Sequence, residues 1–119
     1  MSSNAYLGSR DVQIALKAGT DIVICGRVTD ASPVIGLAAW WHGWNETAFD
    51  VLPGALVAGH LVECSTYATE CNFCDFDRYP TDKLIDVGLP MVDIAEDGSC
   101  IITKDESLNG IAKIDTVTG

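Results

Sequence analysis

Basic residues are scarce in this sequence: seven Lys and Arg stand against 17 Asp and Glu, which gives a formal net charge of −10 at pH 7. Such a surplus of negative charge repels nucleic-acid phosphates and anionic membrane surfaces. We therefore expect no nucleic-acid partner and no membrane partner. An anionic small molecule would need a local positive pocket or a set of backbone amides to overcome this overall field.

Long apolar runs are also missing, because no stretch approaches the roughly 20 residues that cross a bilayer. The start of the sequence lacks the basic and apolar regions of a signal peptide. The five cysteines are an odd number, which argues against a complete disulfide framework. Together these features predict a cytoplasmic protein with reduced thiols.

Apolar residues, by contrast, are abundant: they make up 48% of the chain, and the mean hydropathy is +0.22. The 119 residues are enough for one core, and a short chain has much surface to cover with polar groups. We expect a single α/β domain over residues 1–119. The surplus of apolar surface predicts contact with a partner, and a homo-oligomer would supply one.

The central stretch of the chain runs from Asp21 to Ser32. Its run of Ile22, Val23 and Ile24 suits a strand covered on both faces, as in a parallel sheet. In open α/β sheets, ligands bind in the crevice beyond the carboxyl ends of strands. The polar residues that follow this run are therefore the expected substrate-binding residues: Arg27, Thr29, Asp30 and Ser32.

Two interpretations of Arg27 and Asp30 stay open at this point. In the first, the guanidinium binds an anion and the carboxylate orients it. In the second, the two side chains form an ordinary ion pair, and Asp30 or Ser32 caps the helix that follows.

Helices are expected on both sides of this stretch. Residues 9–18 place apolar side chains on one face, which predicts a first helix. A second helix is predicted to begin at Ser32, acting as its N-cap with proline next, and to end or bend at Gly43. A third is predicted over residues 54–69, where the small Ala58-Gly59 pair would let another backbone approach closely.

A β-hairpin is the clearest local signal. Residues 91–95 and 100–103 are short β-prone runs, and the Asp97-Gly98 pair between them tolerates the positive φ of a tight turn. Residues 72–83 have no clear period and predict a loop, whereas residues 111–117 predict a last strand. The fold class predicted is α/β, with a partial parallel or mixed sheet, flanking helices and a C-terminal β-hairpin.

Titratable side chains cluster near the end of the third predicted helix. His60 and Glu63 form a candidate acid/base pair, since proton transfer needs groups that titrate near the operating pH. Cys64 is a candidate nucleophile if a nearby base or positive charge generates its thiolate. We assign these three as candidate catalytic residues. The alternative is a structural histidine and cysteine beside a surface glutamate.

A metal site is a further interpretation of the same region. Zinc favours four nitrogen or sulfur ligands, and His60, Cys64, Cys71 and Cys74 could supply them, with CxxC spacing in the last two. One CxxC without a second matched pair is weak support for zinc. We therefore assign no metal ligands and leave the cofactor unknown.

Six short segments carry a resemblance through their shared order: Asn4–Gly8, Ala18–Ile24, Gly26–Ser32, Ala58–Cys64, Asn72-Phe73, and Asp97-Gly98 through Thr103-Lys104. In this order they resemble an internal part of the acyclic terpene utilisation (AtuA-like) family. The resemblance extends over most of residues 4–104.

The resemblance implies an α/β core and an association with catabolism of acyclic terpenes and branched acyl-CoA compounds. It therefore implies a terpenoid or acyl-CoA ligand in a small-molecule crevice. Family members are much longer, which implies that this chain is a fragment or truncated form of a longer family domain. The alternative, from a different functional class, is a noncatalytic truncated remnant or an oligomeric interaction module.

Overall fold

The computed structural model describes residues 5–69 and 74–118. The chain divides into two compact units. The first unit comprises Met1–His60 with Ile94–Cys100, and the second unit comprises Leu61–Asp93 with Ile101–Gly119. The boundary falls inside the third helix and inside both strands of the hairpin, and each unit is described separately below.

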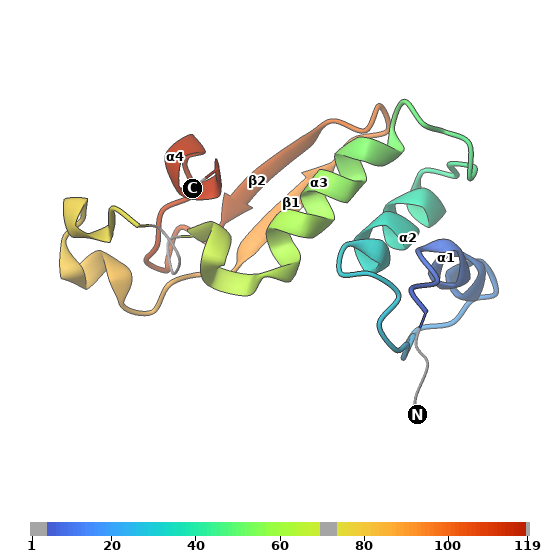
Figure 1. The fold of residues 1–119 in the computed structure, drawn as a ribbon, viewed down its shortest axis with the longest axis horizontal. Helices are drawn as coiled ribbons and strands as arrows, with labels where there is room; N and C mark the ends of the chain where they lie inside the picture. Colours follow the sequence, from blue (N-terminus) through green and yellow to red (C-terminus); the bar gives the residue numbers. More distant parts are fainter. Residues whose placement is uncertain (1–4, 70–73, 119) are drawn as a thin grey trace. The chain divides into compact units, whose positions relative to one another are not determined.

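The described elements are, in chain order, α1 (Arg10–Lys17), α2 (Ser32–Trp41), α3 (Leu52–Glu63), the 3₁₀ helices η1 (Ser65–Thr69), η2 (Phe76–Arg78) and η3 (Thr81–Leu84), β1 (Pro90–Ile94), β2 (Cys100–Lys104) and α4 (Ile114–Thr118). Strands β1 and β2 form an antiparallel hairpin, which Figure 1 shows together with the helices. The α/β fold class and the C-terminal hairpin are thus confirmed.

The parallel or mixed sheet that the sequence predicts is wrong, because the sheet in the described part of the chain is the antiparallel β1–β2 pair. The segment from Asp21 to Cys25 is not a strand, and Ile22 and Ile24 are 76% and 94% exposed. An apolar run shows that a segment is suited to burial in a sheet. It cannot show whether a neighbouring strand is present to pair with it.

The last predicted strand is also wrong, since helix α4 occupies its second half. The Thr116 hydroxyl accepts a hydrogen bond from the Lys113 amide at 3.0 Å and donates to the Ile111 carbonyl at 2.8 Å. Such bonds from a threonine side chain to nearby backbone compete with strand pairing. The predicted loop over residues 72–83 contains η2 and η3 within its described part.

Helices α1 and α2 pack against each other in the first unit (Figure 1). A Cβ atom at Gly36 would lie 2.8 Å from both the Ser9 carbonyl oxygen and the Val12 Cβ, so glycine permits this close approach. The two helices begin and end within a residue or two of their predicted positions, which confirms both predictions. Gly43, with φ of 70°, follows the end of α2 as expected.

The core of the first unit is formed by Ala38, Ala39, Trp44 and Ala55. The Trp44 indole N–H donates to the Glu96 carbonyl at 3.1 Å, and its ring stacks on His42 with 5.0 Å between centroids. The backbone around Trp44 is held as well, because the buried Gln13 amide donates to its carbonyl at 2.8 Å. These bonds connect α1, the end of α2 and the hairpin tip within this unit.

Helix α3 is buried along its small residues, Ala55, Ala58 and Gly59. A Cβ atom at Gly59 would lie 2.9 Å from the Ala31 carbonyl oxygen. The prediction that the Ala58-Gly59 pair permits close backbone approach is therefore confirmed. The predicted helix was too long, however, because residues 65–69 form the 3₁₀ helix η1.

The second unit is organised around Thr69, whose side chain is fully buried. Its hydroxyl donates to the Gly88 carbonyl at 2.6 Å, and its own carbonyl accepts the Ile111 amide at 3.3 Å. An isolated parallel bridge joins Val87 and Asn109 nearby. Among the described residues, no helix combines the length and apolar character that a membrane span requires.

Candidate functional site

Arg27 and Asp30 lie on the loop that leads into α2 and form an ion pair through Nη1 and Oδ1. Their side chains are 63% and 51% exposed, so solvent reaches both charges. The structure thus brings together two of the predicted substrate-binding residues.

Thr29 lies on the same loop, and Ser32 is the first residue of α2. Their hydroxyl groups hydrogen bond to each other, and Ser32, which is 2% exposed, also donates to the Val28 carbonyl at 3.4 Å. Thr29 has φ of 136°, a conformation that β-branched residues rarely adopt. The hydroxyl groups of these two residues therefore hold the loop backbone next to the start of α2.

The prediction that Ser32 caps helix α2 is wrong by one position. Ala31 is the N-cap residue, and it makes no side-chain capping bond. The Ser32 hydroxyl instead bonds backwards to Val28, a competing local bond that is typical of serine near helix starts. Asp30 does not cap the helix either, because its carboxylate faces Arg27.

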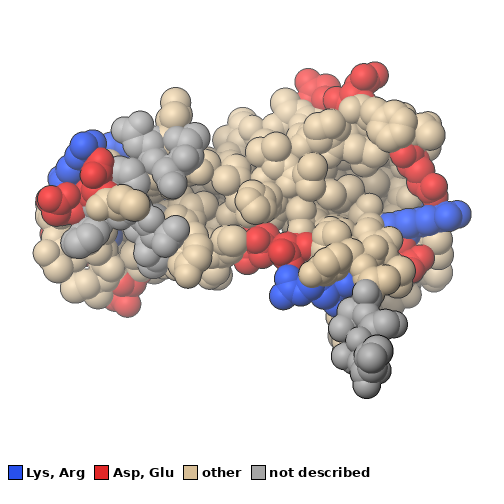
Figure 2. Space-filling view, in the orientation of Figure 1, with Lys and Arg blue, Asp and Glu red and all other residues tan. Residues whose placement is uncertain are grey.

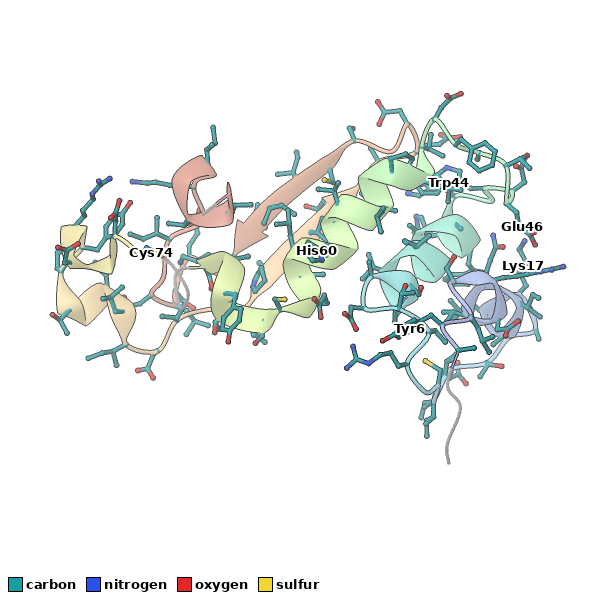
Figure 3. The ribbon with its side chains drawn as sticks, viewed as in Figure 1. Tyr6, Lys17, Trp44, Glu46, His60 and Cys74 are labelled. Atoms are coloured by element: carbon teal, nitrogen blue, oxygen red, sulfur yellow. The ribbon has the colours of Figure 1, made fainter. Side chains whose placement is uncertain are left out.

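A cavity of about 670 Å³ lies beside this loop, and its walls come from two segments: Ala5, Tyr6 and Leu7, and Gly26, Arg27 and Val28. The Gly8 amide donates to the Val28 carbonyl at 2.7 Å and so ties the two segments together. Figure 3 labels Tyr6, which is 69% exposed on the amino-terminal segment.

The amino-terminal wall of this cavity was missed in the sequence. The available signal was the apolar Tyr6-Leu7 pair directly before Gly8, which has φ of 77°. Thr29, Asp30 and Ser32 are not among the cavity's lining residues. Of the four predicted substrate-binding residues, Arg27 is therefore the one that lines the cavity.

The candidate catalytic residues lie at the end of α3 and just after it. His60, labelled in Figure 3, is exposed and belongs to the first unit, whereas Glu63 and Cys64 belong to the second. The Cys64 thiol donates to Glu63 Oε1 at 2.9 Å, a distance that permits proton transfer. The catalytic roles of His60, Glu63 and Cys64 stay predictions.

Of the four weighed zinc ligands, Cys71 lies outside the described residues. Within residues 5–69 and 74–118, no three His, Cys, Asp or Glu side chains come together in a group that could hold a metal ion.

A smaller cavity of about 370 Å³ lies in the second unit. Its lining is apolar apart from one lysine: Ile102, Ala112, Lys113, Ile114 and Val117. The Lys113 ammonium group lies 5.9 Å from the centre of the Tyr79 ring, within the range of a cation–π contact. The sequence did not predict this hollow, because α4 was expected to be a strand.

A family model described as acyclic terpene utilisation family protein AtuA matches residues 1–119, the whole chain. The chain belongs to the acyclic terpene utilisation family. This confirms the resemblance carried by the six segments, and membership in the AtuA family points to a role in acyclic terpene utilisation. No curated protein and no solved structure matches the chain. The roles of single residues in this AtuA family member therefore rest on geometry.

Proposed function

We propose that the first unit binds an acyclic terpenoid or branched acyl compound through an anionic group, in the cavity beside Arg27. One observation supports this above all: Arg27 lines a cavity of about 670 Å³ together with Tyr6 and the apolar residues Ala5, Leu7 and Val28. The volume is within the range of cavities that bind small molecules.

The chemistry of this wall suits a ligand with two different ends. Aliphatic and aromatic side chains favour a branched hydrocarbon, because both surfaces leave water on contact. The guanidinium group offers a fork of N–H donors that matches a carboxylate or a phosphate. Two sources could supply this anion: a free terpenoid acid, or the coenzyme A part of an acyl thioester.

Charge makes Arg27 the deciding residue. The chain carries a net charge of −10, and basic side chains form only a few separate groups on the face shown in Figure 2. An anion approaching this protein is repelled on average and needs a local cation. Removal of the Arg27 side chain should therefore weaken the binding of an anionic ligand more than the binding of a neutral one.

Chemistry on such a ligand would need a group that moves a proton. We propose His60 for this role, because it belongs to the same unit as the cavity. Glu63 and Cys64 belong to the second unit, where we propose them separately as an acid/base and thiol pair. We also propose that the protein works in the cytoplasm, where its thiols stay reduced.

The test is a binding and thermal-shift series with geranic acid, its coenzyme A thioester, free coenzyme A and the neutral alcohol geraniol. We expect the acid or the thioester to raise the melting temperature, because a ligand that binds the folded state stabilises it. In Arg27→Ala, the Kd for the anionic ligand should rise roughly 10-fold or more, since hydrogen bonds to charged groups contribute about 1.5–3 kcal/mol.

Arg10→Ala is the matched control, because Arg10 is also in the first unit, is 66% exposed and pairs with Glu46 at 2.8 Å. It removes the same charge away from the cavity and should leave Kd within about two-fold, the effect expected of an exposed ion pair. Equal losses in both variants, or no response to any ligand, would refute the proposed site. Free coenzyme A shows whether the thioester binds through its acyl chain.

A second candidate function is an oligomeric interaction module. The observation that favours it is the exposure of large apolar side chains in the first unit, above all Ile24 at 94% and Ile22 at 76%. Exposed apolar side chains that neighbour one another often mark protein interfaces. This candidate predicts a self-associated protein, which is tested below through the mass in solution.

A further inference from the structure

We infer that Asp30 is a built-in competitor for Arg27, so that an anionic ligand must displace this carboxylate from the guanidinium group or bind beside it. This inference rests on the proposed ligand site and adds a residue that sets its affinity for anions. The role assigned to Asp30 differs from the helix-capping and ligand-binding roles considered above.

The starting point is the ion pair itself. Arg27 uses Nη1 to bind Oδ1 of Asp30, and both side chains are more than half exposed. Arginine has five N–H donors, so several remain for a second acceptor. Exposed ion pairs contribute little to stability, because water screens them. A ligand anion can therefore displace the Asp30 carboxylate at low cost.

The loop backbone keeps Asp30 close to Arg27 when no ligand is present. On one side, the Val28 carbonyl accepts the Gly8 amide at 2.7 Å. On the other, the Ser32 amide donates to the Thr29 carbonyl at 3.1 Å, and the Ser32 side chain is buried. The carboxylate is thus held at a high local concentration, separated from Arg27 by only two residues in the chain.

This arrangement affects anionic and neutral ligands differently. A neutral alcohol cannot replace the charge–charge contact between Arg27 and Asp30, but it can accept a hydrogen bond from an N–H donor that Asp30 leaves free. Its binding therefore depends little on Asp30. A carboxylate or phosphate replaces the ion pair between Arg27 and Asp30 by one between Arg27 and the ligand. The hydrocarbon part of the ligand adds contacts with the apolar residues of the cavity. Asp30 therefore lowers the affinity for anions by a modest factor and leaves the affinity for neutral ligands almost unchanged.

The experiment compares Asp30→Asn with the unmodified protein, using isothermal titration of geranic acid, its coenzyme A thioester and geraniol. Asparagine keeps the size and one acceptor oxygen but removes the competing charge. We expect the Kd for an anionic probe that binds to fall roughly two- to five-fold, the ratio that corresponds to an exposed ion pair. The Kd for geraniol should change by no more than about 1.5-fold, because a neutral alcohol does not compete with the Asp30 carboxylate for an ion pair.

Asp21→Asn is the matched control, because Asp21 is exposed, belongs to the first unit and does not line the cavity. Both variants lower the net negative charge by one unit, so a general charge effect would appear equally in both. Asp30→Glu keeps the carboxylate and should bind within about two-fold of the unmodified protein. Melting temperatures without ligand verify that each variant is folded.

The outcomes separate this inference from the proposed function. Tighter anion binding in Asp30→Asn alone supports the competitor. Unchanged or weaker anion binding in folded Asp30→Asn, or an equal gain in Asp21→Asn, overturns it while leaving the Arg27 site intact if Arg27→Ala still loses binding. If Arg27→Ala binds as well as the unmodified protein, the proposed site itself is wrong.

Discussion

Thr29 shows at the scale of one residue how the candidate site departs from local preference. Its φ of 136° lies in a region that glycine occupies readily and threonine avoids. Strained residues persist where surrounding contacts hold them, and such places are common at ligand sites. Here the contacts are the hydroxyl of Ser32 and the anchored carbonyl of Val28. These contacts hold the strained backbone of Thr29 within the loop that carries Arg27.

We predict that Thr29→Gly is more stable to urea than Thr29→Ala by about 1 kcal/mol or more. Both variants lose the hydroxyl, but alanine keeps the Cβ atom that makes this φ unfavourable, whereas glycine relieves the strain of about 1–3 kcal/mol and loses only part of it to backbone entropy. The free energies of unfolding of the two variants test this directly. An alanine variant equal to or more stable than the glycine variant would show that Thr29 is not strained.

At the scale of the element, the tip of the β1–β2 hairpin needs glycine for two reasons: its backbone angle and its close packing. Gly98 has φ of 81°, and a Cβ atom there would lie 2.6 Å from the Val51 carbonyl oxygen, just before α3. Asp97 supports the same turn by accepting the Ser99 hydroxyl at 2.6 Å and its amide at 2.9 Å. These bonds from Ser99 lower the pKa of Asp97 below its usual value. The carboxylate thus favours the turn in its ionised form.

Gly98→Ala should destabilise the protein by about 3 kcal/mol, because it adds both an unfavourable backbone conformation and a clash with backbone. Gly19→Ala is the matched control, since Gly19 has φ of 82° but no atom within 4 Å of an added Cβ. That variant should cost only about 1 kcal/mol, the conformational part. Urea unfolding gives the loss of stability in each variant, and the difference between the two losses is the contribution of packing at Gly98. Equal losses would mean that the tip does not pack closely against Val51.

Helix and hairpin positions were largely predictable because their signals are local. Proline at position 33, glycine at 43 and the Asp97-Gly98 pair restrict backbone angles wherever they occur. The strand predicted at Asp21–Cys25 failed for the opposite reason, since a strand exists only if a partner supplies its hydrogen bonds. The cavity walls from Ala5 to Leu7 were missed because a bond between Gly8 and Val28 creates them.

At the scale of the whole molecule, the high apolar content of the sequence leaves several large apolar side chains exposed. Ile22 and Ile24 are exposed on a segment whose sequence suits burial on both faces. Phe49, also in the first unit, is 71% exposed but lies in a turn. Pairing of the 21–25 segment between two copies would cover the isoleucines and satisfy its backbone groups.

We therefore predict that the protein is at least a dimer in solution and that Ile24→Ser shifts it towards the monomer, weakening association roughly 10-fold for the loss of one buried apolar side chain. Phe49→Ser removes a similarly exposed apolar side chain and should leave association unchanged. Light scattering coupled to size-exclusion chromatography measures the mass. A monomeric unmodified protein, or equal effects of both variants, would contradict self-association through this segment.

By itself, the sequence determined the acidic balance, the family, the first two helices and the hairpin, because composition and short-range backbone restrictions act without reference to the rest of the chain. Only the tertiary structure decided that the Ile22–Ile24 run stays uncovered, that Tyr6 and Leu7 share a cavity with Arg27, and that Asp30 pairs with this arginine instead of capping α2. These features depend on which backbone groups meet, and local preference cannot specify that.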